Sequence, residues 1–345
     1  MTEESRTFNG RSKTWVALAA CVIIAAGLIV YANSFAVPFV FDDLPTVRDN
    51  PGIRQLGTAW RQPAQQGITI SGRPLAGLSV ALNYAVSGTH VWSYHLFNVA
   101  IHLLCGLTLF GIVRRTFSRF LLERGVGSAK SGSFVRSEPA DRNTSHIVAI
   151  AAALLWTVHP LQTESVTYIA QRVESMMGLF YLLTLYCFIR YADRLSSEAP
   201  SEGMRAEKMP ANAWIWPAVL ASLCGMACKE VMVTAPLLVV LYDRTFLSGS
   251  FREAWRRHHT IFLGLAATWL LLVFEVAGAG NRGGTAGYGA HVGPWRYALA
   301  QCPAILHYLG LCFWPHPLVF DYGWGLAWDG GVLSDEVIIL PRHRS

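Results

Sequence analysis

Two adjacent aspartates follow the first long apolar stretch of the chain, in the sequence FVFDDLPTVRDNP that runs from Phe39 to Pro51. A carboxylate at a membrane surface can serve as a general base or a metal ligand, because partial burial and a like-charged neighbour raise its affinity for protons. An adjacent Asp pair can equally begin a solvated loop. Asp42 and Asp43 are therefore the first candidates for chemistry, and the pair alone leaves both alternatives open.

A second polar cluster, HPLQTESVTYIAQRVE, begins at His159. If this stretch is one helix, Glu164, Tyr168, Gln171 and Arg172 have the spacing i, i+4, i+7 and i+8 and share a face. A water-facing helix end would have the same pattern. Charged side chains so close to an apolar core are costly unless they are paired, which favours a functional role for this cluster.

Three further charged residues stand at the ends of apolar runs. Lys229 and Glu230 separate two such runs, where they form either the charged turn of a hairpin or, through the lysine, a compact counter-charge for a phosphate. Arg73 precedes Pro74, and because proline is favoured at the first helical position we expect Arg73 at the head of a helix. It is either an anion contact or an ordinary interface arginine.

Three polar side chains lie inside an apolar segment at helical spacing. His95, Asn98 and His102 occupy positions i, i+3 and i+7 and therefore share one face. No carboxylate neighbours them at ligand spacing. The pattern favours hydrogen bonding between helices over metal ligation.

The composition indicates that a membrane holds these residues in place. The 345-residue chain is 52% hydrophobic and 14% charged, whereas soluble domains have roughly 25% charged residues. The uncharged stretch from Trp15 to Tyr31, at about 1.5 Å per residue, nearly spans a hydrocarbon core of about 30 Å. Its apolar run is longer than that of a cleaved signal peptide, so we interpret it as an uncleaved first span.

Seven more apolar segments predict an all-α polytopic protein with about eight spanning or part-spanning helices. Several are shorter than the ~17 residues that a free-standing span needs, so some are expected to be broken or re-entrant. The last segment could cross the bilayer or lie in the outer interface. The segments are Tyr94–Val113, Ile147–Val158, Ser175–Ile189, Trp214–Cys228, Val231–Tyr242, Thr260–Val276 and Tyr297–Phe313.

Lys and Arg in the loops predict the orientation, because such residues favour the cytoplasmic side. The basic loops Arg114–Ser145, Arg190–Lys208 and Arg244–Arg257 are therefore expected inside with the N-terminus. Because successive loops alternate between the two sides of the membrane, four polar regions are expected outside. The net charge of +6 is mostly explained by the basic cytoplasmic loops, so it gives little support for a nucleic-acid partner. The outer regions are Asn33–Ser93, His159–Arg172, the turn Cys228–Glu230 and Ala277–Arg296.

Five ordered stretches between Tyr31 and Trp324 resemble the transmembrane and TPR-repeat-containing O-mannosyltransferase family, within the GT-C glycosyltransferase fold. They are YANSFAVPFVFDDLPTVRDNPGI, RPLAGLSVALNYAVSGTHVWSYHLFNVAIHLLCGLTLF, HPLQTESVTYIAQRVESMMGLFYLLTLY, CKEVMVTAPLLVVLYDRTF and FWPHPLVFDYGW. The resemblance implies a transferase that moves a sugar, mannose in that family, from a polyprenyl-phosphate carrier to Ser or Thr hydroxyls of proteins on the extracytoplasmic face.

The resemblance also implies roles for the candidate residues. The family's acidic motif in the first outer loop corresponds to Asp42 and Asp43, and we predict Asp42 as the base with Asp43 as its electrostatic partner or a metal ligand. Whether a divalent metal takes part is left open. A phosphate-ester leaving group needs positive charge more than a proton donor, so cations are expected near it, with carboxylates orienting them or the sugar. The cations are Arg73, Arg172 and Lys229, and the carboxylates are Glu164 and Glu230.

The predicted organisation is a cytoplasmic N-terminus (1–14), a GT-C-like transmembrane domain (15–324) and a short polar tail (325–345). The domain includes an outer loop (33–93) and a cytoplasmic loop (114–145). The family's TPR array and last spans are expected to be missing after FDYGW, as in a truncated product. Two alternatives remain: a transporter, whose path would include His95, Asn98, His102 and Glu275, and a non-catalytic membrane scaffold.

Overall fold

The computed structural model describes residues 3–63, 65, 67–128, 139–197, 210–271, 273, 294–320 and 322. The regular structure of these residues is helical, with no strand among them. Several helices are long enough and have a high enough mean hydropathy to cross a membrane, as in membrane proteins. The expected all-α class is confirmed.

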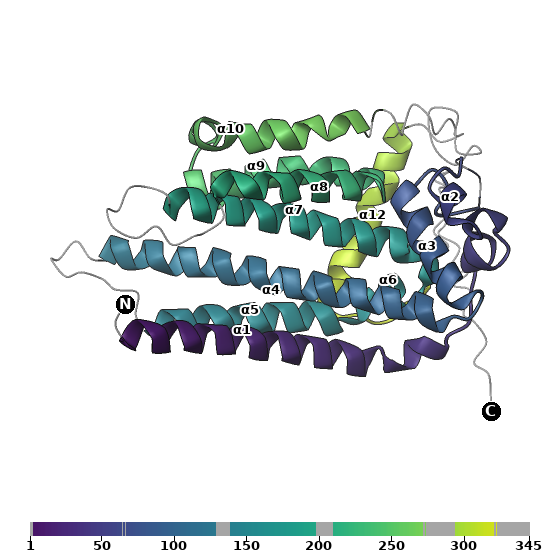
Figure 1. Cartoon of the computed structure of the whole chain (residues 1–345), viewed down its shortest axis with the longest axis horizontal. Coiled ribbons are helices and arrows are strands. Elements are labelled where there is room, and N and C mark those ends of the chain that lie inside the picture. The colour runs from purple at the N-terminus through teal and green to yellow at the C-terminus, as the bar shows by residue number, and fades with distance from the viewer. Residues whose placement is uncertain are drawn as a thin grey trace.

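Long helices lie side by side and give the molecule its elongated shape (Figure 1). The central helix α4 (Trp92–Ser128) packs against α1 (Glu3–Val30), α5 (Pro139–Val158) and α7 (Arg172–Ser197). A second group, α8 (Ile215–Met226), α9 (Ala235–Asp243) and α10 (Phe251–Ala267), packs on α7 around a core that includes Phe188, Ile261 and Leu265.

Three helical stretches in the described part of the chain are long and apolar enough to cross a membrane: Trp92–Leu122, Ile169–Ser196 and Glu230–Ser248. A fourth is the pair Asn143–Val158 and Pro160–Thr167, bent by 51°. Two other expected spans, the first one and the one at Trp214–Cys228, correspond to shorter apolar helices, Thr14–Val30 and Ala211–Met226. Pieces of this length agree with the expectation that some helices only part-span the membrane. The last residues of the expected segment 260–276 lie outside the described residues.

The segment that we predict as the outer loop (33–93) folds over one end of the bundle (Figure 1). It contains the short turns Ala32–Ala36, Leu44–Arg48 and Pro51–Ile53, then α2 (Leu56–Ala59) and α3 (Pro74–Ser87). Helix α3 begins at Pro74 with Arg73 at its N-cap, as predicted. Its Gly77 faces α2 so closely that an added Cβ would lie 2.5 Å from the carbonyl oxygen of Ala59, which fixes the contact between these two helices.

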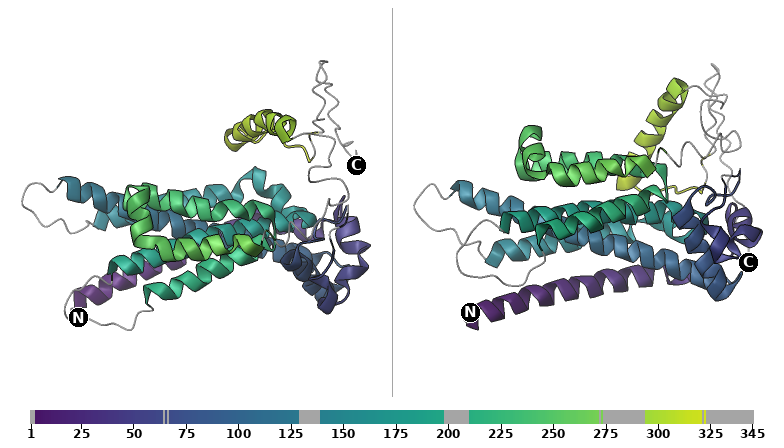
Figure 2. Two further views of the ribbon diagram at one scale, coloured as in Figure 1. Left: turned by 90° about the horizontal axis from the view of Figure 1, so that it is seen from above. Right: turned by 45° about the horizontal axis from the view of Figure 1, so that its top comes forward.

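The last described helix, α12 (Pro294–Phe313), is inclined to the other long helices in Figure 1 and stands apart from them in the left view of Figure 2. Its C-terminal end returns to the bundle, where Nε2 of His159 lies 3.1 Å from the carbonyl oxygen of Cys312. The residues that follow this end reach Phe41, on which Phe320 stacks.

Arg172, the first residue of α7, is completely buried where α3, α4 and α7 meet. Its Nε donates to Oδ1 of Asn98 at 2.8 Å, one terminal nitrogen to Oδ1 of Asn83 at 2.6 Å, and the other to the carbonyl oxygen of Tyr94 at 2.9 Å. The guanidinium also lies over the ring of Phe97, 4.6 Å from its centroid. This single side chain therefore joins three helices.

Replacing Arg172 by Met should lower the free energy of unfolding by about 3–5 kcal/mol, because three buried oxygens would lose their donors. Thermal unfolding of the purified protein in detergent micelles measures the change. The matched control is Arg54→Met, since Arg54 is exposed at the same end, and this change is expected to have little effect. Equal midpoints for both variants would contradict the buried junction.

Candidate active site

The Asp pair lies on a tight bend in which the two side chains point to opposite environments. Phe41 has a φ of 45°, in the left-handed region that non-glycine residues seldom adopt. The next residue, Asp42, is exposed, whereas Asp43 is only 1% exposed. The backbone at Phe41 thus stores a small amount of strain and separates one solvent-facing carboxylate from one buried carboxylate.

Asp43 is bound by backbone amides. Its Oδ1 accepts the N–H of Ala170 at 2.7 Å, and its Oδ2 accepts the N–H of Val40 at 3.2 Å. Burial raises the pKa of Asp43 to about 6, although these hydrogen bonds and the charge of Arg172 act in the opposite direction. With both oxygens occupied and no path to solvent, Asp43 is suited to holding the bend in place and not to meeting a substrate.

Asp42 presents its carboxylate outward. Its backbone N–H donates to the hydroxyl oxygen of Tyr168 at 3.0 Å, and its Oδ2 accepts a long hydrogen bond of 3.4 Å from the hydroxyl of Thr69. The backbone of Asp42 is therefore fixed while one carboxylate oxygen already lies beside an alcohol. An exposed carboxylate beside a hydroxyl is the kind of group that general-base chemistry uses.

Aromatic side chains border this carboxylate. Phe320 stacks on Phe41 with ring centroids 4.8 Å apart and meets Tyr168 edge-on at 5.0 Å. The segment after α12 therefore lies against the bend that carries Asp42.

The stretch His159–Glu174 is not the single helix that a shared face for its polar residues would require. The chain forms α6 (Thr163–Thr167), is extended at Tyr168 (φ −85°, ψ 113°), and resumes with a short turn before α7. In a continuous helix the N–H of Ala170 would donate to the carbonyl of Val166. Asp43 accepts that N–H instead, and the carbonyl of Val166 accepts from Nδ2 of Asn98 at 3.2 Å.

The break separates residues that were expected on one face. Glu164 accepts a hydrogen bond of 3.1 Å from Nε2 of Gln171, while Arg172 turns into the bundle. All three guanidinium nitrogens of Arg172 bond within the protein, so in this structure it contacts no surface where a phosphate could bind. Arg172 is connected to the Asp pair by its charge, which acts to lower the pKa of Asp43.

Two ion pairs lie beside the Asp segment. Arg73 bonds Oε2 of Glu230 at 3.4 Å, and its other terminal nitrogen donates to the carbonyl of Thr69 at 2.9 Å. Lys229 forms an ion pair with Glu174 in the first turn of α7. Thr69 therefore contacts both Asp42 and Arg73, and this chain of contacts continues to Glu230 and its neighbour Lys229.

The turn between α8 and α9 is tied to the outer segment by the backbone as well. The N–H of Leu75 in α3 donates to the carbonyl oxygen of Ala227 at 3.3 Å, two residues before Lys229. Sequence reasoning missed Thr69 and Glu174 as members of the site. Thr69 stands in a polar loop with no motif, and nothing in its local sequence indicates contact with Asp42.

The polar residues His95, Asn98 and His102 of α4 make hydrogen bonds to other parts of the bundle, which is the role that their spacing favours. Nε2 of His95 lies 2.9 Å from the carbonyl of Val37, and Nε2 of His102 lies 2.8 Å from the carbonyl of Thr157. Asn98 joins α6 and α7, as described above. Glu275, the other residue of the transporter hypothesis, lies outside the described residues.

No three His, Cys, Asp or Glu side chains in the described ranges gather where they could hold one metal ion. Asp43 fits a metal poorly because both its oxygens face backbone N–H groups. The described acidic pair therefore offers Asp42 as its one outward-facing carboxylate.

Comparisons with known proteins find relatives of one kind. The chain is 28% identical over 236 residues to the protein O-mannosyl-transferase TMTC2 of Mus musculus, a match that covers 66% of this chain and 24% of the relative. It is 29% identical over 235 residues to the protein O-mannosyl-transferase Tmtc3 of Drosophila melanogaster, a match that covers 65% of this chain and 23% of that protein. It is 25% identical over 232 residues to the protein O-mannosyl-transferase TMTC4 of Mus musculus, a match that covers 64% of this chain and 29% of that protein.

The chain thus spans about a quarter of the length of the curated relatives it matches. No family model and no solved structure matches it. Over about two thirds of its length the chain is nonetheless related in sequence to the protein O-mannosyl-transferases, which confirms the family resemblance carried by its motifs.

Proposed function

We propose that this chain is a membrane glycosyltransferase, which transfers a sugar, mannose, from a polyprenyl-phosphate carrier to Ser or Thr hydroxyls of acceptor proteins. The proposal places the reaction at the end of the bundle that carries Asp42 and assigns that end to the extracytoplasmic face. The relatives are named protein O-mannosyl-transferases, which supports the reaction class. The main structural support for the site is the exposed carboxylate of Asp42, which lies beside the hydroxyl of Thr69. The buried Asp43 holds the bend that presents Asp42.

In this mechanism Asp42 is the general base. The acceptor hydroxyl must lose its proton as its oxygen attacks the anomeric carbon, so a carboxylate oxygen must lie within hydrogen-bond reach of it. The Thr69 hydroxyl, 3.4 Å from Oδ2 of Asp42, marks a direction from which an acceptor alcohol could approach. The new C–O bond forms as the bond from the anomeric carbon to the carrier phosphate breaks, and Asp42 receives the proton.

The departing phosphate needs positive charge to stabilise it. Arg73 and Lys229 supply it in our proposal, because both are partly exposed and lie in the contact chain that starts at Asp42. Glu230 and Glu174 hold these two cations in place and limit their motion. Arg172 keeps a role behind Asp43, where its buried charge favours the ionised form of that carboxylate.

Asp42→Asn should reduce transfer by about 10²- to 10⁴-fold, the usual contribution of a positioned general base. The measurement is transfer of radiolabelled mannose from its polyprenyl phosphate to a Ser/Thr-containing acceptor peptide by the purified chain in lipid vesicles. Asp49→Asn is the matched control, because Asp49 is exposed in the same segment and pairs with Arg48. Similar rates for the Asp42→Asn variant and wild type would refute the base assignment.

Lys229→Gln should raise the KM for the lipid-linked donor by at least tenfold, with a smaller effect on the KM for the acceptor peptide, because a charge-assisted contact to the carrier phosphate would be lost. The same transfer assay at varied donor concentration measures it. Lys229→Arg should retain most of the donor affinity. Unchanged donor KM in Lys229→Gln would remove this residue from the phosphate site.

The raised pKa of Asp43 predicts a pH-dependent contribution to stability. The folded-state pKa of Asp43, about 6, exceeds its unfolded value. Protonation of Asp43 therefore makes its full contribution to the free energy of unfolding below about pH 4. This contribution is lost as the pH rises through about 6. Asp43→Asn lacks this titration, so the melting temperature of wild type relative to the variant should fall between pH 4 and pH 7. A difference that is constant over this range would contradict the assigned burial.

A further inference from the structure

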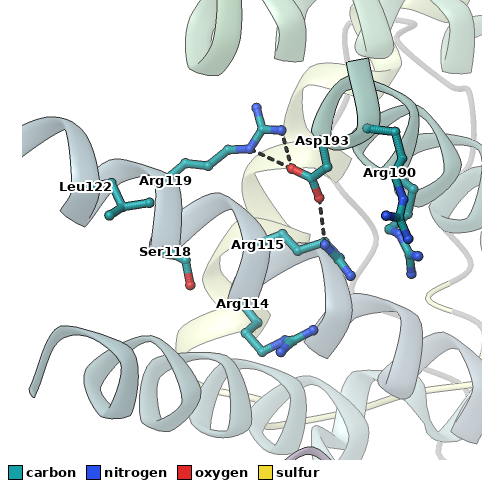
Figure 3. A pocket seen from close by; sticks show the side chains of 8 residues that line it. Arg114, Arg115, Ser118, Arg119, Leu122, Arg190 and Asp193 are labelled. Carbon is teal, nitrogen blue, oxygen red and sulfur yellow. Dashed lines mark hydrogen bonds and ion pairs between the residues drawn. The ribbon is translucent and has the colours of Figure 1, made fainter. Parts of the chain in front are cut away.

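A basic pocket lies at the end of the bundle opposite to the Asp pair, between α4 and α7 (Figure 3). Both helices run from the Asp end through an apolar stretch and then present arginines at this end. The cavity has a volume of about 440 Å³, and its charged lining residues are Arg114, Arg115, Arg119, Arg190, Asp193 and Arg194.

Asp193 engages two of these arginines. Its Oδ2 accepts from Arg115 at 2.6 Å, and its Oδ1 accepts from Nε of Arg119 at 3.0 Å (Figure 3). One carboxylate therefore holds two guanidinium groups in place. Five arginines and one aspartate leave an excess of four positive charges in one pocket, which is unfavourable unless an anion joins them.

Among the described residues, the remaining arginines form no salt bridge, although Asp193 also attracts Arg114 electrostatically. Arg190 donates to the neutral hydroxyl of Tyr186 at 3.1 Å and lies over the ring of Trp214, 4.3 Å from its centroid. Within the described ranges, Arg114 and Arg194 form no ion pair, and Nε of Arg114 is buried without a hydrogen-bond partner. Donors are thus available for an anionic ligand.

The depth of the pocket indicates what carries that anion. Starting from Trp92, about 20 helical residues cross a ~30 Å hydrocarbon core, so the arginines from Arg114 onward fall in the headgroup layer. Arg190 stands at a similar distance from the start of the second apolar stretch, Ile169–Ser196. Leu122 also lines the pocket and is 51% exposed, which gives the cationic cavity an apolar rim.

We propose that this pocket binds the phosphate-bearing headgroup of an anionic membrane lipid, with the acyl chains lying along the apolar surfaces of α4 and α7. Basic pockets between membrane helices are suited to such headgroups, because the bidentate geometry of arginine matches phosphate oxygens. This site is separate from the proposed transfer site and its donor, which lie at the other end of the bundle. It anchors the two central helices in one leaflet.

Native mass spectrometry of the purified full chain in detergent tests the proposal, with dioleoyl phosphatidylglycerol and dioleoyl phosphatidylcholine as probes at equal concentration. Wild type should retain phosphatidylglycerol at least tenfold more strongly. Arg114→Gln/Arg190→Gln should weaken its binding about 25-fold, since each surface cation contributes about fivefold. The pair Arg115 and Arg119 is left intact to preserve the bridge to Asp193.

Two variants separate the pocket from general charge and from misfolding. Arg252→Gln/Arg256→Gln removes the same charge from exposed positions of α10 at the same end and should leave binding unchanged. Arg114→Lys/Arg190→Lys keeps the charge and should retain most of the preference even if the packing changes.

Three results would overturn the proposal. The first is equal retention of the two lipids by wild type, and the second is an equal loss in the α10 control. The third is displacement of phosphatidylglycerol by glycerol phosphate or inorganic phosphate at equal concentration, because the pocket would then bind a soluble anion and not a lipid.

Discussion

The geometry of the candidate site depends on the replacement of one helical hydrogen bond. The N–H of Ala170 and the carbonyl of Val166 would be partners in a continuous helix, but each bonds a side chain from elsewhere, Asp43 and Asn98. Both groups of the lost helical pair therefore keep a partner, so the chain can be extended at Tyr168 without the loss of free energy that two unpaired groups would cause. The same extension places the Tyr168 hydroxyl under the backbone of Asp42 and directs Arg172 into the bundle.

The buried polar groups around this break form one connected arrangement. Arg172 donates hydrogen bonds to the side-chain oxygens of Asn83 and Asn98. Asn98 in turn donates to the carbonyl oxygen of Val166, which the break in the helix leaves without its backbone partner. A buried charge is costly when it stands alone, and it is tolerated here because every guanidinium nitrogen has an acceptor and Asp43 lies near. A rigid interior of this kind allows Asp42 to stay exposed and still be held in position.

The sequence was sufficient to predict most of the helices. It also led us to expect the Asp pair near Arg73, Lys229 and Glu230, and in the structure Thr69 connects Asp42 with the ion pair of Arg73 and Glu230. Apolar runs set the helices, Pro74 set the start of α3, and the basic loops indicated which polar regions share a side. The orientation of Arg172 and the break at Tyr168 were not predictable, because both depend on partners that are 68 or more residues away in the sequence. Periodicity describes local preference, and here distant hydrogen-bond partners outweigh it.

The contact between Phe41 and Phe320 has a consequence for the order of assembly during synthesis. A ribosome adds about 5–20 residues per second, so Phe320 emerges roughly 15–60 s after Phe41. Asp43 and Ala170 can meet much earlier, as can Arg73 and Glu230. The carboxylates and their neighbouring cations are therefore in place while the nascent chain is still being made, and the aromatic ring that borders Asp42 arrives last.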